Sequence, residues 1–584
     1  MVVFVLYLLP AVWAYRYAWA HPTAVALASG DPLQSMWYLQ WVPWALGHGH
    51  NPLFTVIGNY PLGVNMVAQT STLALGFLAS PFTVLWGPTL SYNVLMTLAF
   101  PLSAGAAYLL ARRFVAWRPA AFVAGAIYGF SPYMLGQGLG HLNLVFVALS
   151  PLILLVLHQL VVVQTGSPVR WGLLLAALVV VQFFISTEIL ATTAIVAAFA
   201  LVALALLNRT QVVPRVHFAL IGLGTGAAGA LMVLAYPLYV LLAGPQHISG
   251  PPPGFTIYRS AFFGPLLPTA MVKLSTPHLR QVAGALLGGN LSENGSYLGP
   301  GVVLLSLGSL AFIRRKVATV AGIVALAVFV ISIGSPFRTG IPSIAGFGSS
   351  LPLPADLFGR VPLLKEAYPV RYTLHIALFA GLGVAVAIEA VRVRSRRRSF
   401  EAGTDDERHL GVGARARHLA LPAVAGVVAL LPLVPSWPYP TQGRFPIPPY
   451  FTSSAVDAIP EGSVTVLYPW PDGGSQLWQA RSNMRFRIAG GDFLTPSGPH
   501  RDFNYTPVSL ASTIFHQLQT GPAPTETPVL RHALRAELGS WTVQNIVASP
   551  PTGAPVAFIT WLTGRPPSEI TGGVAGWYHL TWTG

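Results

Sequence analysis

The sequence predicts a polytopic α-helical membrane protein with about eleven transmembrane helices and a C-terminal extracytoplasmic α/β domain. Of the 584 residues, 53% are apolar and only 9% are charged, whereas about 25% of the residues in a soluble chain are charged. Several apolar runs reach or approach the roughly 20 residues that cross a bilayer as a helix. After residue 437 the apolar runs shorten and polar residues return, which predicts a change to a soluble domain.

The expected membrane helices alternate correctly across the bilayer if every Arg-rich connection is cytoplasmic, as the positive-inside rule requires. The N-terminus is then inside and the C-terminus outside. These connections hold Arg112 to Arg118, Arg170, Arg209 to Arg215, Arg314 to Lys316, and Arg392 to Arg417. The expected helices are 1–20, 90–111, 119–137, 141–163, 171–188, 190–207, 216–243, 297–313, 317–334, 368–391 and 418–436.

Two apolar segments near the N-terminus admit a second interpretation. The segment 66–87 is apolar enough to cross the membrane, but a crossing would move Arg112 and Arg113 outside. We therefore expect a juxtamembrane or re-entrant pair of short helices there. The motif ALASG resembles a signal-peptide cleavage site after Ala28, but no basic region precedes the apolar run and Arg16 interrupts its end. We expect this segment to stay in the protein, and a longer natural N-terminus remains open.

The predicted membrane domain covers residues 1–436, with outer loops 21–89, 244–296 and 335–367, and the outer domain covers 437–584. In the outer domain, SVTVLYPWP, MRFRIAGGD and WTVQNIVASP have strand patterns, and GGSQLWQARSN and PVLRHALRAEL favour helices. The Pro-rich segment 436–450 predicts a linker. The mixed-charge loop RSRRRSFEAGTDDERHLGVGARAR predicts disorder.

Several function classes are disfavoured by composition and motif. The net charge of +15 lies in short connections between apolar runs, so it indicates cytoplasmic loops and not a nucleic-acid surface. The chain has no cysteine, which excludes disulfides, thiolate nucleophiles and zinc-thiolate sites. It has no Walker loop, no G-x-S-x-G and no H-E-x-x-H motif. The Gly-rich GLGTGAAG lies inside an apolar span, where close helix packing explains it best.

Ionisable and polar residues at the membrane edge are costly, so they are functional candidates by default. In the predicted topology they gather on the outer face, contributed by many separate segments, as the wall of a cavity at the outer leaflet would be. They are Asp31, Gln34 and Gln40 after the first helix, Gln137, His141 and Asn143, Glu188, the loop residues Arg259, Lys273, His278, Arg280 and Glu293, and Tyr368, Arg371 and Tyr372 at the start of the tenth helix.

Each candidate also has a purely structural interpretation. His141 and Asn143 could be helix-cap or turn residues, Glu188 could pair with a structural arginine, and Arg371 could be an interfacial anchor. Asp31 could cap the helix that Pro32 begins, a role compatible with catalysis. The neighbouring tryptophans favour an amphipathic helix lying on the membrane over a sugar-stacking surface; they are Trp37, Trp41 and Trp44.

Five segments occur in an order that resembles the GT-C superfamily of membrane glycosyltransferases, and more narrowly its YfhO-like and bacterial mannosyltransferase-like members. The segments are GDPLQSMWYLQW, NPLFTVIGNYPLGVN, YGFSPYMLGQGLGHLNL, ENGSYLGPGVVLL and PLLKEAYPVRYTLHIAL. They cover most of residues 30–380. The C-terminal domain adds no recognisable motif.

The resemblance implies transfer of a hexosyl or pentosyl group from a polyprenyl-phosphate donor to a glycan, lipid or protein acceptor on the outer face. The family's loop-one carboxylate corresponds to Asp31, because 21–89 contains no other Asp or Glu. Asp31 would be the general base. Arg371, followed by Arg259, Lys273 and Arg280, would bind the lipid phosphate. The sugar pocket would be lined by Gln34, Gln137, His141, Asn143, Glu188, Glu293 and Tyr297.

The resemblance leaves the metal open. Some members use a divalent ion such as Mg²⁺ or Mn²⁺, and this sequence has one acidic residue where some of them have an adjacent pair. Two other functions compete: a lipid or glycan transporter or flippase, which needs paired charges near the midplane, and a non-catalytic scaffold that binds envelope glycan. Heavy use of Arg, Ala, Gly, Pro and Val suggests a GC-rich bacterial genome, so we expect a multi-pass protein of the bacterial plasma membrane.

Overall fold

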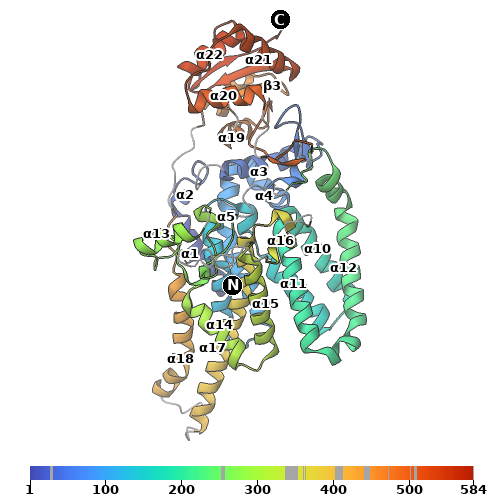
Figure 1. Ribbon diagram of the computed structural model, residues 1–584, viewed down its shortest axis with the longest axis vertical. Helices are drawn as coiled ribbons and strands as arrows, with labels where there is room; N and C mark the ends of the chain where they lie inside the picture. The colour runs from blue at the N-terminus through green and yellow to red at the C-terminus, as the bar shows by residue number, and fades with distance from the viewer. Residues whose placement is uncertain are drawn as a thin grey trace. The chain divides into compact units, whose positions relative to one another are not determined.

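The chain is largely helical and divides into two compact units, which we describe separately (Figure 1). The first unit comprises 1–16, 96–233 and 253–439, and the second comprises 17–95, 234–252 and 440–584. The computed structural model describes residues 1–26, 31–250, 257–287, 289–335, 353–358, 361, 364–401, 412–439, 447–470, 473–499, 501–504 and 509–582. The candidate cleavage site after Ala28 lies outside the described residues, as do 402–411 of the predicted disordered loop and 440–446 of the predicted linker.

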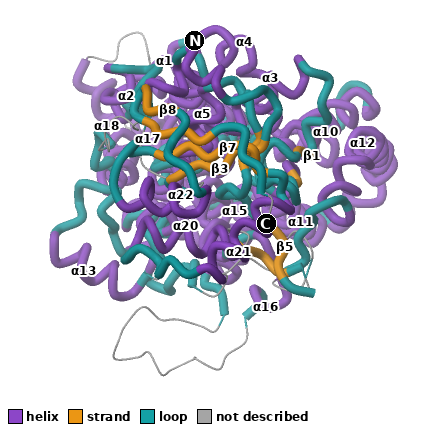
Figure 2. Tube along the Cα trace, turned by 90° about the horizontal axis from the view of Figure 1, so that it is seen from above, coloured by secondary structure: helices purple, strands orange, loops and turns teal. Residues whose placement is uncertain are grey.

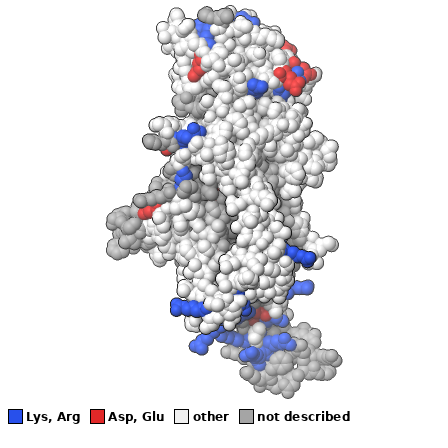
Figure 3. All heavy atoms as spheres, turned by 90° about the vertical axis from the view of Figure 1, so that its right-hand side faces the viewer, with Lys and Arg blue, Asp and Glu red and all other residues white. Residues whose placement is uncertain are grey.

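Within the described ranges, six helices are long and apolar enough to cross a membrane, so the chain is a membrane protein. They are Pro88–Ala111, Leu142–Val163, Pro168–Ile185, Thr187–Leu207, Arg209–Ala243 and Pro369–Arg397. The other expected spans correspond to apolar helices that are shorter than about 18 residues, so the predicted total of about eleven is not confirmed. The Lys and Arg atoms of the first unit gather at its lower end in Figure 3, where the α14–α15 connection and the end of α17 lie in Figure 1.

The first unit is a helix bundle in which α10, α11 and α12 run side by side (Figure 1). α12 begins there and continues into the second unit, and α5 (Pro88–Ala111) spans both units. The remaining helices are α1 (Val2–Ala14), α6 (Arg118–Gly129), α7 (Pro132–Gln137), α8 (Leu142–Val145), α9 (Leu149–His158), the π-turn η2 (Gln159–Val163), α10 (Pro168–Ile185), α11 (Thr187–Leu207), α12 (Arg209–Ala243), α14 (Pro300–Phe312), α15 (Lys316–Ser332), α17 (Thr373–Glu401) and α18 (Val412–Leu430).

Two predicted helices are interrupted. The expected helix 119–137 is two helices, because Ser131 adopts extended backbone before Pro132, as residues that precede proline commonly do. The Ser131 hydroxyl then caps α7 by accepting a hydrogen bond from the Met134 N–H at 3.3 Å. The expected helix 1–20 is likewise divided at Tyr15 into α1 and α2 (Arg16–Ala20).

The segment 66–87 forms a 3-10 turn, η1 (Met66–Ala68), and one helix, α4 (Leu73–Trp86). With 14 residues, α4 is about 21 Å long, which is shorter than the roughly 30 Å of a hydrocarbon core. It packs against α3 (Asp31–Gly47), with Gly76 directly facing Val42. The length agrees with the expected short helix, and the topology of this segment stays a prediction.

The second unit contains a five-stranded sheet in the order β4-β3-β7-β9-β8 (Figure 2). β3 pairs parallel with β4 and β7, whereas β9 pairs antiparallel with β7 and β8. Every residue of β3 is buried, as expected for a parallel strand covered on both faces. The strands are β3 (Val464–Tyr468), β4 (Arg487–Ile488), β7 (Val543–Ala548), β8 (Glu569–Thr571) and β9 (Val574–Trp577).

Helices cover both faces of this sheet. α20 (Leu510–Thr520), α21 (Pro528–Ser540) and α22 (Ala554–Thr563) bury Phe515, Leu534 and Phe558 against one face. α19 (Gly473–Arg481) buries Trp478 against the other face. The strands and helices expected from the sequence motifs of this region are therefore present at their predicted places.

The loop that follows α3 is joined to the β4 edge of the sheet. The Asn59 N–H donates to the Gly490 carbonyl at 2.7 Å, and the Tyr60 N–H donates to the Ile488 carbonyl at 2.9 Å. The same unit holds two short antiparallel pairs, β1 (Phe54–Thr55) with β2 (Val64–Asn65), and β5 (Thr495–Ser497) with β6 (Asp502–Asn504). Residues 17–95 therefore fold with 440–584. The division at residue 436 remains a prediction that the contacts do not follow.

Candidate functional site

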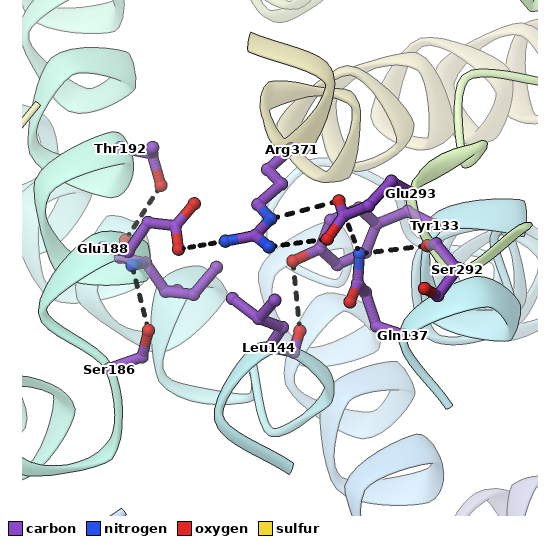
Figure 4. Close-up of polar contacts among 10 residues, drawn as sticks. Tyr133, Gln137, Leu144, Ser186, Glu188, Thr192, Ser292, Glu293 and Arg371 are labelled. Atoms are coloured by element: carbon purple, nitrogen blue, oxygen red, sulfur yellow. Dashed lines mark hydrogen bonds and ion pairs between the residues drawn. The ribbon is translucent and has the colours of Figure 1, made fainter. Parts of the chain in front are cut away.

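One arginine of the first unit is held between two carboxylates, and we call Glu188, Glu293 and Arg371 the Arg371 clasp (Figure 4). Arg371 Nη1 lies 2.6 Å from Glu188 Oε2. On its other side, Arg371 Nη2 lies 2.5 Å from Glu293 Oε1 and Nε lies 3.1 Å from Glu293 Oε2. The contact with Glu293 is thus bidentate, the strong form of an arginine–carboxylate pair.

Each member of the clasp comes from a different part of the sequence. Glu188 lies in the first turn of α11, just after the break at Ser186 that ends α10. Glu293 ends the 3-10 turn η4 (Leu291–Glu293), which Asn290 caps by accepting a hydrogen bond from the Glu293 N–H at 3.1 Å. Arg371 lies in η7 (Pro369–Tyr372), immediately before α17. The clasp therefore ties three distant segments of the first unit together.

Gln137 completes the support of Glu293. Its side-chain nitrogen donates to Glu293 Oε2 at 3.2 Å and to the Ser292 carbonyl at 3.1 Å. The Arg371 guanidinium also lies 4.4 Å from the centre of the Tyr368 ring, a cation–π distance. All three donor nitrogens of Arg371 are engaged by carboxylates, so its guanidinium is a poor candidate for binding a lipid phosphate directly.

The charges of the clasp explain the protonation of Glu293. Burial alone raises the pKa of this carboxyl. The adjacent Arg371 charge and its hydrogen bonds lower the pKa by more than burial raises it, so the net shift is downward. The charge of His141 acts in the same direction. The lowered pKa favours the ionised form of Glu293 in its pair with Arg371.

The structure brings Gln137, His141, Glu188, Glu293 and Arg371 into one neighbourhood, in agreement with the predicted clustering. Glu188 pairs with an arginine, as its structural interpretation proposed. The other predicted residues of this unit differ in exposure. Arg259 and Tyr297 are buried, Asn143 is half-buried, and Lys273 and Arg280 are exposed.

In the second unit, Asp31 is the first residue of α3 and is exposed. It is the only acidic residue in the sequence before Glu188. We call Asp31, Gln34, Tyr38, Gln69 and Asp492 the Asp31 site. A carboxylate in the first turn of a helix is stabilised by the helix dipole, so this position favours the ionised form that a general base requires.

The loop after β4 supplies the rest of the Asp31 site. Gln34, one turn after Asp31, donates a hydrogen bond to the Asp492 carbonyl. Gln69 pairs with the same loop through both amide atoms, accepting from the Leu494 N–H at 2.8 Å and donating to the Leu494 carbonyl at 2.7 Å. The loop turns sharply because Gly490 and Gly491 adopt φ values of +84° and +137°, which residues other than glycine rarely adopt.

The charges of two carboxylates, Asp492 and Asp31, act on the hydroxyl of Tyr38. Burial raises the pKa of the Tyr38 hydroxyl well above its ordinary value, and the charges of Asp492 and Asp31 raise it further. The hydroxyl donates to Gln69 Oε1 at 3.3 Å. Tyr38 therefore stays a neutral hydrogen-bond donor within the Asp31 site.

Asp492 and Gln69 were not among the predicted site residues. One sequence feature could have indicated Asp492: the Gly-Gly-Asp that follows the strand pattern MRFRIA. A glycine pair before an acidic residue is typical of a tight turn that presents a side chain. Their pairing with the α3 region is a long-range contact that no local pattern reveals.

The tryptophans of α3 do not form the predicted membrane-surface face. Trp37 and Trp41 are 0% and 1% exposed. The Trp37 indole donates to Gln479 Oε1 at 2.6 Å, and its ring packs edge-on against Phe493 at 5.0 Å. The amphipathic interpretation was wrong because α19 and the loop after β4 cover the face that was expected to meet lipid.

Metal ligands were left open by the sequence. Across the described part of the chain, no group of three or more His, Asp or Glu side chains is arranged to hold a metal ion.

A family model described as "Domain of unknown function (DUF6311)" matches residues 4–338, or 335 of the 584 residues. The chain belongs to the DUF6311 family. No protein of curated function matches the sequence. The narrower resemblance to YfhO-like proteins is not confirmed.

Solved structures similar to this DUF6311 chain are membrane glycosyltransferases at low sequence identity. The mycobacterial arabinofuranosyltransferase AftD is 14% identical, with 99% of this chain and 41% of AftD covered and a TM-score of 0.51. ArnT from Cupriavidus metallidurans bound to undecaprenyl phosphate is 11% identical, covering 98% and 97% of the two chains, with a TM-score of 0.45. The oligosaccharyltransferase AglB from Archaeoglobus fulgidus, in complex with an inhibitory peptide and a dolichol-phosphate, is 13% identical, covering 97% and 70%, with a TM-score of 0.41.

The likeness to AftD concerns the fold alone, and this DUF6311 chain spans about two fifths of the AftD chain. This likeness to an arabinofuranosyltransferase agrees, at the level of the fold, with the architecture expected from the sequence. What the chain does with this fold has to be argued from its own residues.

Proposed function

We propose that the protein is a membrane glycosyltransferase that moves a sugar from a polyprenyl-phosphate donor to a cell-envelope acceptor on the outer face. The observation that carries the proposal is Asp31, an exposed carboxylate at the first turn of α3, one turn before Gln34, which donates to the backbone carbonyl of a second acidic residue, Asp492. The AftD-like fold supports sugar transfer as the class of reaction, and the resemblance of the loop-one segments supports the lipid-linked donor.

Asp31 would act as the general base. It accepts the proton of the acceptor hydroxyl while the acceptor oxygen forms a bond to the anomeric carbon of the sugar. The bond between that carbon and the phosphate oxygen breaks, and polyprenyl phosphate leaves with the electron pair. Because the acceptor attacks the donor directly, the configuration at the anomeric carbon inverts. A positioned general base contributes about 10²- to 10⁴-fold to the rate of such a step.

The neighbours of Asp31 would position it and the acceptor. Gln34 fixes the start of α3 to the loop that carries Asp492, and neutral Tyr38 offers a hydroxyl proton between the two acidic residues. Asp492 would keep the local potential negative. A negative charge nearby raises the proton affinity of Asp31, which favours transfer of the acceptor proton to it.

The remaining predicted residues receive narrower roles. The Arg371 clasp would hold the first unit together, with Gln137, His141 and Asn143 beside it available to sugar hydroxyls. Among the predicted phosphate ligands, the exposed Lys273 and Arg280 have free access to an anion, whereas Arg371 does not. These assignments, including those of Arg259 and Tyr297, stay part of the proposal.

The experiment is transfer of radiolabelled sugar in membranes that contain the full-length protein. A panel of polyprenyl-phosphate donors carrying mannose, glucose or arabinofuranose is supplied, and label in lipid, glycan and protein fractions is counted. We expect D31N to reduce transfer about 10²- to 10⁴-fold, without a matching loss of donor binding. The matched control is Asp457→Asn, which removes an exposed carboxylate of the same unit, 61% exposed and paired with Arg485 at 2.9 Å.

Three results would contradict the proposal. Transfer that survives D31N at the wild-type rate removes Asp31 as the base. A wild-type protein that transfers no sugar from any lipid-linked donor, yet moves labelled lipid across proteoliposomes, replaces the enzyme by a transporter. Equal losses in D31N and D457N would show a general effect of charge and not catalysis.

A further inference from the structure

A large apolar cavity opens between helices of the first unit. Its volume is about 940 Å³, and its walls come from α5, α9, η2, α11, α12, α15 and α17. The lining is mostly Leu, Val, Ala and Phe. Ligand pockets commonly have volumes of about 300–1,000 Å³, so the cavity can hold a molecule of substantial size.

The polar side chains that line this cavity are basic or neutral. Arg215 of α12 donates to the Val162 carbonyl, and Arg315 donates to the Phe114 carbonyl at 2.8 Å. Lys316, the first residue of α15, donates to the Asn208 side-chain oxygen. Backbone and amide oxygens orient these three cations without neutralising them, because none of these partners carries a charge.

Acidic side chains are scarce around the cavity. Among the described residues, no Asp or Glu lines it. Between residues 32 and 355 the chain contains two acidic residues, Glu188 and Glu293, and both are paired with Arg371. α17 also carries Glu389, whose carboxylate accepts a hydrogen bond from the Trp117 N–H at 3.2 Å and lies 3.9 Å from Arg392. The described lining of the cavity therefore combines three cations with no acidic residue.

We propose that this cavity binds one anionic phospholipid of the membrane. Its acyl chains would occupy the apolar walls, and its phosphate would contact Arg215, Arg315 and Lys316, which line the same cavity. Arginine forks suit phosphate oxygens, and basic pockets between membrane helices on the cytoplasmic side bind anionic head groups. These residues lie in connections that the positive-inside rule places in the cytoplasm, so the lipid is one of the inner leaflet.

This proposal does not depend on the transfer reaction. The proposed chemistry takes place at the opposite membrane face and uses a lipid-linked sugar, whereas this site holds a resident phospholipid. Failure of either proposal leaves the other intact, because the first is measured by sugar transfer and the second by lipid retention.

The test is native mass spectrometry of the full-length protein released from nanodiscs that contain equal amounts of phosphatidylglycerol and phosphatidylcholine. We expect the wild type to retain one phosphatidylglycerol. The variant R215Q/R315Q/K316Q should bind it at least tenfold more weakly in a titration of the delipidated protein. The control R394Q/R396Q/R397Q removes the same charge from the end of α17, outside the cavity, and should bind like the wild type.

A second variant probes the apolar half without changing charge. Ala200→Phe places a ring into the wall contributed by α11 and should also release the lipid. Equal retention of phosphatidylglycerol by the wild type and both cavity variants would overturn the proposal. Displacement by inorganic phosphate alone, or preferential retention of undecaprenyl phosphate over phosphatidylglycerol, would overturn the assigned occupant.

Discussion

The Arg371 clasp and the Asp31 site use acidic residues in opposite ways. In the clasp, Glu188 and Glu293 are buried, and both carboxylates are paired with Arg371. In the Asp31 site, the carboxylate that begins α3 is exposed, and the site contains a second acidic residue, Asp492. Breaking a buried ion pair destabilises a fold strongly, whereas an exposed carboxylate is accessible as a proton acceptor.

The largest effect on stability should follow removal of the arginine from the clasp. Arg371→Met leaves two buried carboxylates without a cation, which costs about 3–5 kcal/mol of unfolding free energy. Thermal or denaturant unfolding in detergent measures this. The matched control is Arg485→Met, which breaks a surface pair with Asp457 and should cost about 0–1 kcal/mol. Equal losses in the two variants would show that the clasp is no more important than a surface contact.

A smaller effect should appear when only one carboxylate of the clasp is neutralised. Glu293→Gln weakens its charge-assisted contacts with Arg371 and should cost about 1.5–3 kcal/mol near neutral pH. Because the folded-state pKa of Glu293 is lowered, its contribution is complete above the ordinary glutamate pKa and is lost as the pH falls through the folded value. The wild type should therefore lose more stability on acidification than Glu293→Gln. Parallel pH profiles of unfolding would contradict the assigned ion pair.

The smallest effect on stability should come from the Asp31 site. Asp31→Asn keeps a residue that is favourable at a helix start and weakens a helix-dipole interaction of about 0.3–1 kcal/mol. The unfolding midpoint should therefore remain close to that of the wild type while sugar transfer falls. A loss of stability as large as that of Arg371→Met would place Asp31 with the structural charges and erase the contrast.

The sequence predicted much of the helical architecture because long apolar runs and Arg-rich connections are strong signals. It also predicted Asp31 at a helix start, where α3 begins, and it grouped Gln137, His141, Glu188 and Arg371, which lie in one neighbourhood of the first unit. The functional roles assigned to these residues stay a prediction. The sequence did not reveal that Trp37 is buried, because the segments that cover it lie more than 400 positions away. Asp492 was not predicted as a site residue for the same reason, because its contact with Gln34 joins positions 458 apart. Pairings at such separations depend on tertiary packing, which leaves no periodic trace in either segment.

The joining of the α3 region to the C-terminal sheet also sets an order of events during synthesis. Gln34 and Asp492 are 458 positions apart, and a chain grows at about 5–20 residues per second. The start of α3 therefore waits roughly 20–90 seconds for its partner loop. A nascent or truncated chain that ends before residue 492 lacks Asp492, so the Asp31 site is complete only after the loop that follows β4 has been synthesised.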